Sequence, residues 1–144
     1  MPSFPSKKRI LILDKNTSLS NLVDEITLAG NFDIYTAEDS SGLFEHARAI
    51  KPHLILLDCI LMDSDCQTIC QHLKDDSVLK NVPLIVIAAD GSKKQVSASF
   101  KCDASFVKPQ DMNAVTAQIF FRDIKNYFTY LMMKMGNPYA LASA

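Results

Sequence analysis

The chain contains few of the residues that break helices and strands. Its 144 residues include four Gly, six Pro and no Trp, and its formal net charge is −1 at pH 7. The low Gly and Pro content excludes collagen-like and low-complexity chains. A chain of this length buries about 68% of its unfolded surface, so it can fold around one core without disulfides or structural metal ions. We therefore predict one compact domain.

The sequence also lacks an excess of charge of one sign. Fifteen Lys and Arg residues are balanced by sixteen Asp and Glu, and the isoelectric point is about 6.3. Such a balance gives no bulk attraction to nucleic acid or to an anionic membrane. Neither a signal peptide nor a membrane span is predicted, because the apolar run after Arg9 stops at Asp14. We expect a cytoplasmic protein that binds another protein or a small ligand, and neither nucleic acid nor membrane.

The four cysteines are Cys59, Cys66, Cys70 and Cys102, and none of their spacings is C-x-x-C. We expect reduced thiols that are buried or half-buried. A metal site built from Cys66, Cys70 and His72 is the alternative, although this group lacks a fourth ligand.

Short apolar runs alternate with segments of helical period along the whole chain. The runs predicted as strands are Arg9–Leu13, Phe32–Tyr35, His53–Leu57, Pro83–Ala88 and Ser105–Val107. The first, third and fourth runs are apolar almost throughout, which is typical of parallel strands covered on both faces. The sequence therefore predicts a parallel sheet with helices on each side.

Helical periods follow the strands. The first helix ends at Gly30, the second ends before Pro52, a third carries Ile69 to Leu73, a weaker fourth runs over about 93–100, and a fifth starts near Asp111. Five strand–helix units joined by right-handed crossovers predict an α/β fold with a doubly wound five-stranded parallel sheet. Ligand chemistry in such sheets belongs at the carboxyl ends of the strands.

Charged residues follow three of the predicted strands at these ends. Asp14 follows the first strand, Asp58 the third and Lys108 the fifth. Two carboxylates and one ammonium group are therefore predicted to meet at one edge of the sheet. An Asp alone is often a helix cap and a Lys alone is usually solvated, but three such residues at one edge indicate a reaction site.

Four segments, RILILD, HLILLD, VPLIVIAA and FVKP, resemble the receiver domain of two-component response regulators in order and spacing, over about residues 7–124. The resemblance implies a flavodoxin-like three-layer sandwich without enzymatic activity. It also implies that Asp58 is phosphorylated by a partner histidine kinase and that Lys108 contacts the phosphoryl group. Asp14 resembles an acid near the family's magnesium ion, with the backbone carbonyl of Ile60 as a further ligand.

Several positions depart from the family pattern. Lys15 stands where the family has a second acid directly after the first. Ala88 replaces the Thr or Ser that receives the phosphoryl oxygen, and Ser105 replaces the aromatic residue that changes position on activation. The resemblance is therefore to a degenerate receiver, a pseudo-receiver.

Charge counting extends this comparison. The family's three carboxylates and one lysine sum to −2, which a magnesium ion neutralises, whereas Asp14, Asp58, Lys15 and Lys108 sum to zero. We interpret Lys15 as a substitute for the metal that pairs with Asp14 or Asp58. Magnesium binding is then expected to be weak, and no other cofactor is expected. A Lys15 side chain directed into water is the alternative, and it would still leave the metal one ligand short.

The last predicted helix extends from about residue 111 to Met135, which places the domain at residues 1–135 and leaves 136–144 as a short tail. Val115 and Ile119 are expected to pack on the sheet. Beyond them, a stripe of apolar residues is too long for the sheet to cover: Phe120, Ile124, Tyr127, Phe128, Leu131 and Met135. We expect this stripe to form an interface, with a homodimer favoured, while a helix folded back on its own domain stays open.

Two classes of function are compared. The first is a signalling module that binds a histidine kinase or a downstream protein, either without phosphorylation or with residual phosphotransfer at Asp58. The second is an enzyme or nucleotide-binding domain on the same scaffold. It has little support, because no G-x-G-x-x-G or G-x-x-x-x-G-K-[ST] motif follows a strand.

Overall fold

The computed structural model describes residues 8–13, 20–30, 32–37, 40–58, 64–88, 101–108 and 113–135. The elements in these ranges are β1 (Lys8–Leu13), α1 (Ser20–Ala29), β2 (Phe32–Ala37), α2 (Ser40–Ile50), β3 (Leu54–Asp58), α3 (Ser64–Asp75), β4 (Leu84–Ala88), β5 (Ala104–Val107) and α5 (Ala114–Met135). The helix predicted over about 93–100 lies outside the described residues. No described helix has the length and apolar character needed to cross a bilayer.

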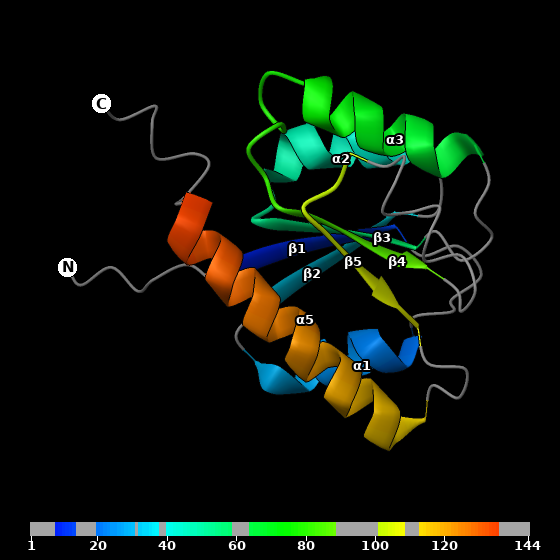
Figure 1. Ribbon diagram of the computed structural model, residues 1–144, viewed down its shortest axis with the longest axis vertical. Coiled ribbons are helices and arrows are strands. Elements are labelled where there is room, and N and C mark those ends of the chain that lie inside the picture. The colour runs from blue at the N-terminus through cyan, green and yellow to red at the C-terminus, as the bar shows by residue number, and fades with distance from the viewer. Residues whose placement is uncertain are drawn as a thin grey trace.

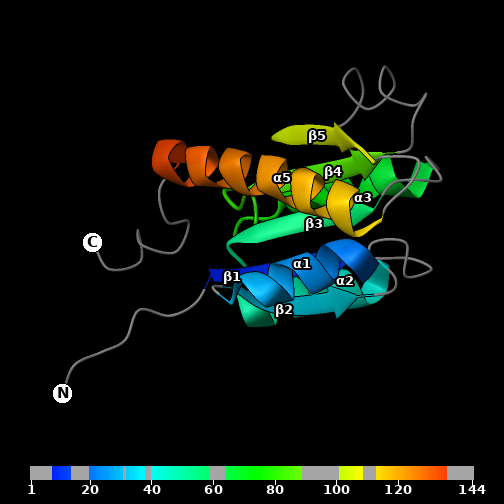
Figure 2. The same ribbon diagram turned by 90° about the horizontal axis from the view of Figure 1, so that it is seen from below.

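The five strands form one parallel sheet with the order β2-β1-β3-β4-β5. Helices α2 and α3 cover one face, and α1 and α5 cover the other (Figures 1 and 2). The predicted doubly wound three-layer sandwich is confirmed. In this strand order the crossover direction changes between β1 and β3, which is where open α/β sheets form their ligand crevice.

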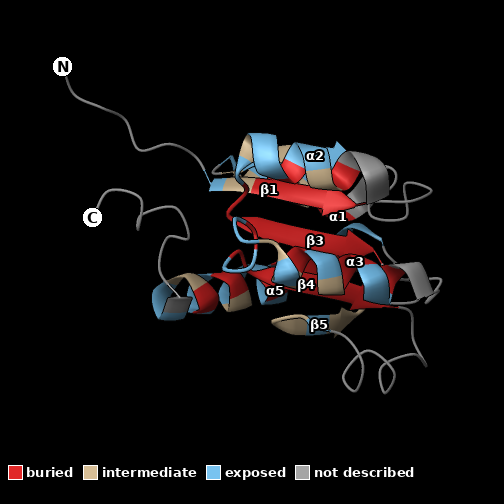
Figure 3. Cartoon of the chain, turned by 90° about the horizontal axis from the view of Figure 1, so that it is seen from above, coloured by how far each residue is buried: buried red, intermediate tan, exposed pale blue. Residues whose placement is uncertain are grey.

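The central strands are buried on both faces, as their continuous apolar runs predict (Figure 3). On β3, Ile55 and Leu57 belong to the core beneath α2 and α3, whereas Leu54 and Leu56 belong to the core beneath α1 and α5. Because successive side chains of a strand point to opposite faces of the sheet, β3 contributes to two separate hydrophobic cores. Both cores fix β3, the strand that ends in Asp58.

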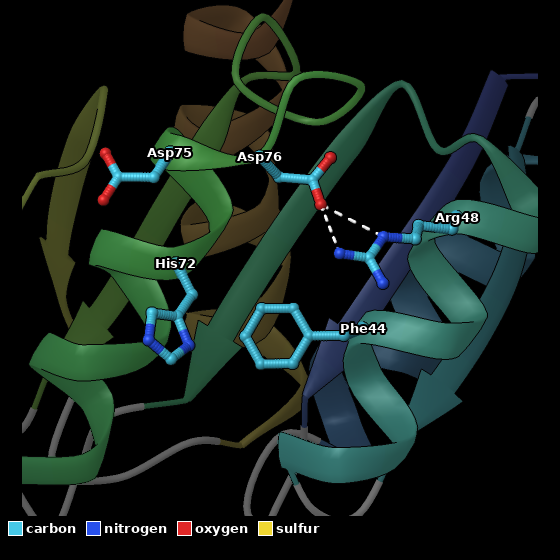
Figure 4. Close-up of a pocket in the computed structure, with 5 residues that line it drawn as sticks. All are labelled: Phe44, Arg48, His72, Asp75 and Asp76. Carbon is cyan, nitrogen blue, oxygen red and sulfur yellow. Dashed lines mark hydrogen bonds and ion pairs between the residues drawn. The ribbon is translucent and has the colours of Figure 1, made fainter.

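Helices α2 and α3 are joined by an ion pair at their carboxyl-terminal ends. Arg48 donates from Nε and Nη2 to Oδ2 of Asp76, at 3.0 and 2.6 Å, and the Phe44 and His72 rings lie 5.7 Å apart (Figure 4). The Asp76 side chain is only 9% exposed. Its hydrogen bond from Arg48 is the main cause of its lowered pKa. These groups, together with Asp75, line a cavity of about 470 Å³.

Arg9 and His53 form a hydrogen-bonded group at the amino-terminal edge of the sheet, opposite Asp58. The Arg9 backbone N–H donates to Nδ1 of His53 at 3.0 Å, and the Arg9 side chain donates to the carbonyls of Ile50 and Lys51 at the end of α2. His53 is 6% exposed. Burial, followed by the charges of Arg9 and Lys8, lowers the pKa of His53 from 6.5 to about 4. His53 is therefore held as a neutral hydrogen-bond acceptor.

Helix α5 begins at Ala114 rather than near Asp111, because the Asn113 side chain caps it by accepting a hydrogen bond from the Thr116 N–H at 2.9 Å. The expectation that Val115 and Ile119 pack on the sheet is wrong, since they are 64% and 46% exposed. The helix is rotated so that its large aromatic residues are buried instead.

The predicted apolar stripe on α5 is covered mainly by the chain itself. Phe120, Ile124, Phe128 and Leu131 are each 5% exposed or less. The Phe32 ring, at the start of β2, lies 6.3 Å from the Phe128 ring. The chain itself covers these four side chains, which agrees with the alternative in which the helix folds back on its own domain. Tyr127 is half-buried, and the Met135 side chain is not described.

Candidate functional site

Asp58 is the most distinctive polar residue of the core. It ends β3, a strand whose five residues are all buried, and it is 7% exposed. The other buried polar or charged residue in the described part of the chain is His53, at the opposite edge of the sheet. A carboxylate held in this way at the carboxyl end of a parallel strand lies where the fold forms its ligand site.

Lys108 is brought to the same edge by β4 and β5. Asp58 is paired with Ile87 on β4, and Ala88, the next residue, is paired with Val107 on β5. The Lys108 N–H donates to the Ala88 carbonyl at 2.8 Å, which continues the strand pairing by one residue. The backbone thus fixes Lys108, a half-buried cation, two strands away from the Asp58 carboxylate.

The end of β1 lies at this edge as well. Leu13 is paired with Leu57, which directly precedes Asp58. The predicted site residues Asp14, Lys15 and Ile60 lie outside the described residues. Their predicted roles as metal ligands and as a substitute for the metal therefore stay predictions.

Ala88 and Ser105, the two residues predicted to depart from the receiver pattern at its activation positions, are both described. Ala88 is 1% exposed and belongs to the same core cluster as Leu57. Ser105 is exposed on β5. A methyl group thus occupies the end of β4, and a small polar side chain occupies the β5 position.

Chemically, this edge presents the Asp58 carboxylate and, two strands away, the cationic residue Lys108. Magnesium prefers octahedral oxygen ligands. Of the ligands predicted for it, Asp58 is the one that lies within the described residues. Within the described ranges, no group of three or more His, Cys, Asp or Glu side chains is placed to hold a metal ion.

The cysteines differ in part from the prediction. Cys66 is disulfide-bonded, so the expectation of a reduced thiol is wrong there, and the alternative metal site of Cys66, Cys70 and His72 is not formed. Cys70 and Cys102 are free, as expected. Burial, with a smaller contribution from nearby Cys102, raises the pKa of Cys70 to about 12.

Comparison with known proteins identifies relatives among transcriptional and response regulators. The chain is 31% identical over 114 residues to the DNA-binding dual master transcriptional regulator RpaA of Synechocystis sp., covering 77% of this chain and 47% of RpaA. It is 30% identical over 105 residues to the response regulator PleD of Caulobacter vibrioides, covering 72% of this chain and 23% of PleD. The chain thus spans about half of RpaA and less of PleD. No protein-family model matches the chain.

The fold also matches solved structures. One is the receiver domain of a sensor histidine kinase from Pseudomonas aeruginosa, whose structure has a magnesium ion coordinated in the active-site cleft. The TM-score is 0.66 with 15% sequence identity, and the match covers 85% of this chain and 98% of that domain. At this identity the likeness concerns the fold alone.

Proposed function

We propose a function for this chain as a response-regulator receiver domain, an assignment that its sequence relatives and its fold both support. In two-component signalling, it acts as an atypical receiver in which magnesium-dependent phosphorylation of Asp58 is impaired. Its output depends on contacts with other proteins. The observation that carries this proposal is the buried carboxylate of Asp58, at an edge where Ala88 offers no hydroxyl.

Charge compensation explains the impaired phosphorylation. Phosphoryl transfer to a carboxylate brings two anions together, so the site must supply positive charge. In our proposal, the Lys15 ammonium group takes the place of magnesium by pairing with Asp14 or Asp58, so the charge that the metal would bring to the phosphoryl group is missing. A pair at about 4 Å and an effective dielectric near 20 is worth about 4 kcal/mol before desolvation is subtracted. A magnesium ion has to displace this pair in order to bind.

The altered activation residues imply weak coupling between Asp58 and the distant surface. A modification shifts an equilibrium only when its two states contact the modified group differently. The Ala88 methyl group cannot accept or donate a hydrogen bond, and Ser105 has no ring to exchange between buried and exposed positions. We therefore propose that partners read the surface of this domain constitutively or through another signal.

Incubation with acetyl phosphate and magnesium tests the state of Asp58. Intact-mass spectrometry is expected to find a phosphate gain at least about tenfold slower than in a receiver with the full acidic set, because the metal is poorly held. Any gain should vanish in Asp58→Asn and persist in Asp33→Asn, which alters an exposed carboxylate on β2. Rapid, complete labelling at Asp58 would instead favour the alternative of a competent phosphoacceptor.

The partners proposed are a histidine kinase or a downstream signalling protein, together with a second copy of the chain. Burial of four stripe residues moves the proposed dimer contact to the exposed side of α5, where Val115 and Ile119 lie. Light scattering is expected to give the mass of two chains, and Ile119→Glu should give one chain without loss of folding, because the side chain is solvent-accessible. A mass of one chain at all concentrations would contradict the proposed dimer.

A further inference from the structure

Two free thiols lie close together in the core beneath α3. Cys70, in the middle of α3, is 0% exposed, and both cysteines are reduced. Cys102, two residues before β5, is half-buried and packs against the core cluster to which Cys70 belongs. The proximity of Cys102 also contributes to the raised pKa of Cys70. Neither thiol has a role in the site around Asp58, so the pair is available for chemistry of its own.

A buried ion pair fixes the backbone on both sides of these thiols. Lys74, one turn after Cys70 on α3, donates from Nζ to Oδ2 of Asp103 at 2.7 Å. Asp103 directly follows Cys102, and its Oδ2 also accepts the Leu84 N–H at 2.7 Å. The Asp103 N–H in turn donates to the Leu84 carbonyl at 2.8 Å. Helix α3 is therefore fastened to the segment that leads into β5, with one cysteine on each side of the contact.

The same face of α3 already carries an oxidised cysteine. Cys66 is disulfide-bonded. It lies one turn before Cys70, and both belong to the same core cluster. The fold thus accommodates a disulfide on the buried face of this helix.

The two free thiols differ in accessibility, and this difference sets the order in which they react. Burial raises the pKa of both thiols, that of Cys70 to about 12. A fully buried thiol of this kind is inert towards reagents in solution. A small oxidant therefore reaches Cys102 first, and Cys70 reacts only with a sulfur that is already held at Cys102.

We propose that Cys70 and Cys102 form a redox modification site, which an external small-molecule disulfide converts into a second disulfide of the domain. The Cys102 thiol loses its proton to solvent, and its sulfur attacks the external disulfide. One half of the reagent leaves as a thiolate, and a mixed disulfide remains at Cys102. The Cys70 thiol then loses its proton to solvent, its sulfur attacks the Cys102 sulfur, and the second half leaves as a thiolate.

This sequence oxidises the two cysteines and reduces the external disulfide to two thiols. The new bond joins α3, the helix that follows Asp58 in the chain, to the segment that leads through β5 to Lys108. The site goes beyond the proposed function and does not depend on it, because none of its chemistry passes through Asp58.

Oxidised glutathione is the probe that tests this proposal on the intact chain. Mass spectrometry without reduction is expected to find the chain lighter by two hydrogen atoms, and peptide mapping to find a pair joined through Cys70 and Cys102. The midpoint of thermal unfolding should rise by at least about 5 °C, because the bond restricts the unfolded chain. Free thiols after prolonged incubation, a stable glutathione adduct at Cys102 or a bond from either cysteine to Cys66 would each overturn the proposal.

Matched variants test the order of the two steps. Cys70→Ala keeps the core apolar and should stop the reaction at one glutathione adduct on Cys102. Cys102→Ala removes the accessible thiol, so Cys70 should remain free. Equal labelling of the two variants would contradict the pair, and Cys70→Ser serves if Cys70→Ala does not fold. Asp58 labelling by acetyl phosphate is measured separately on the reduced chain, so failure of this site is distinguished from failure of the receiver function.

Discussion

Replacing Lys15 by Asp is expected to tighten magnesium binding by at least about 100-fold, or about 2.7 kcal/mol. The substitution removes a cation that competes with the metal and adds a carboxylate of the kind magnesium prefers. It would restore the three-carboxylate set of the family beside Lys108. Calorimetric titration of the purified chain measures the change directly. The same variant should gain phosphate from acetyl phosphate faster than the unaltered chain.

A neutral variant separates the two effects of this substitution. Lys15→Met removes the competing charge without adding a ligand, so it should tighten binding by only about tenfold. If Lys15 is directed into water, Lys15→Met should bind magnesium no better than the unaltered chain. Equal magnesium affinities in the unaltered chain, Lys15→Met and Lys15→Asp would contradict charge compensation at this edge.

Acidification is expected to remove about 3 kcal/mol of stability through His53 alone. The pKa of His53 is about 4 in the folded chain, whereas the unfolded chain has the ordinary histidine value of 6.5. Between these values the unfolded state binds more protons, so the contribution is complete above pH 6.5 and is lost as the pH falls towards 4. A protonated Nδ1 cannot accept the hydrogen bond from the Arg9 N–H.

Urea denaturation at about pH 7.5 and about pH 4 measures this loss. His53→Asn is the matched control, because its amide oxygen can accept the Arg9 N–H but does not titrate. Acidification also removes the stabilising contribution of Asp76. The pKa of this carboxyl is lowered in the folded chain, so its contribution is present above the ordinary pKa and is lost as the pH falls. That contribution is common to both proteins and cancels in their difference. The same acid loss in both proteins would show that His53 is not its cause.

The sheet could be predicted from the sequence because its signals are local. The apolar runs of β1, β3 and β4 have the composition of strands covered on both faces, and the positions of Asp58 and Lys108 follow from where those strands end. Strand boundaries were less exact. The third strand, predicted over His53–Leu57, is Leu54–Asp58, since the backbone of Asp58 still pairs with Ile87.

The packing of α5 could not be predicted because it depends on contacts distant in sequence. Its apolar positions fit more than one helical face. Phe32, at the start of β2, covers part of the stripe that the sheet alone is too short to cover, with ring contacts to Phe121 and Phe128. Burying these rings leaves Val115 and Ile119 on the opposite side. A periodic pattern identifies a helix but does not show which of its faces packs against the rest of the fold.

For the candidate site, the sequence predicted only which charged residues lie at the carboxyl ends of the strands. Residue types at those ends indicated a reaction site, and the resemblance to the receiver family supplied the roles. The open aromatic surface formed by Phe106, Tyr127 and Tyr130 was missed, because Phe106 lies on β5 while the two tyrosines lie on α5. No sequence period links these elements.

The central claim is that a fixed lysine side chain takes the place of the metal beside Asp58. Isothermal titration of the unaltered chain with magnesium tests it most directly. We predict weak uptake, with no saturation at millimolar magnesium, which corresponds to a binding free energy weaker than about −4 kcal/mol. Tight uptake of one magnesium ion per chain would contradict it.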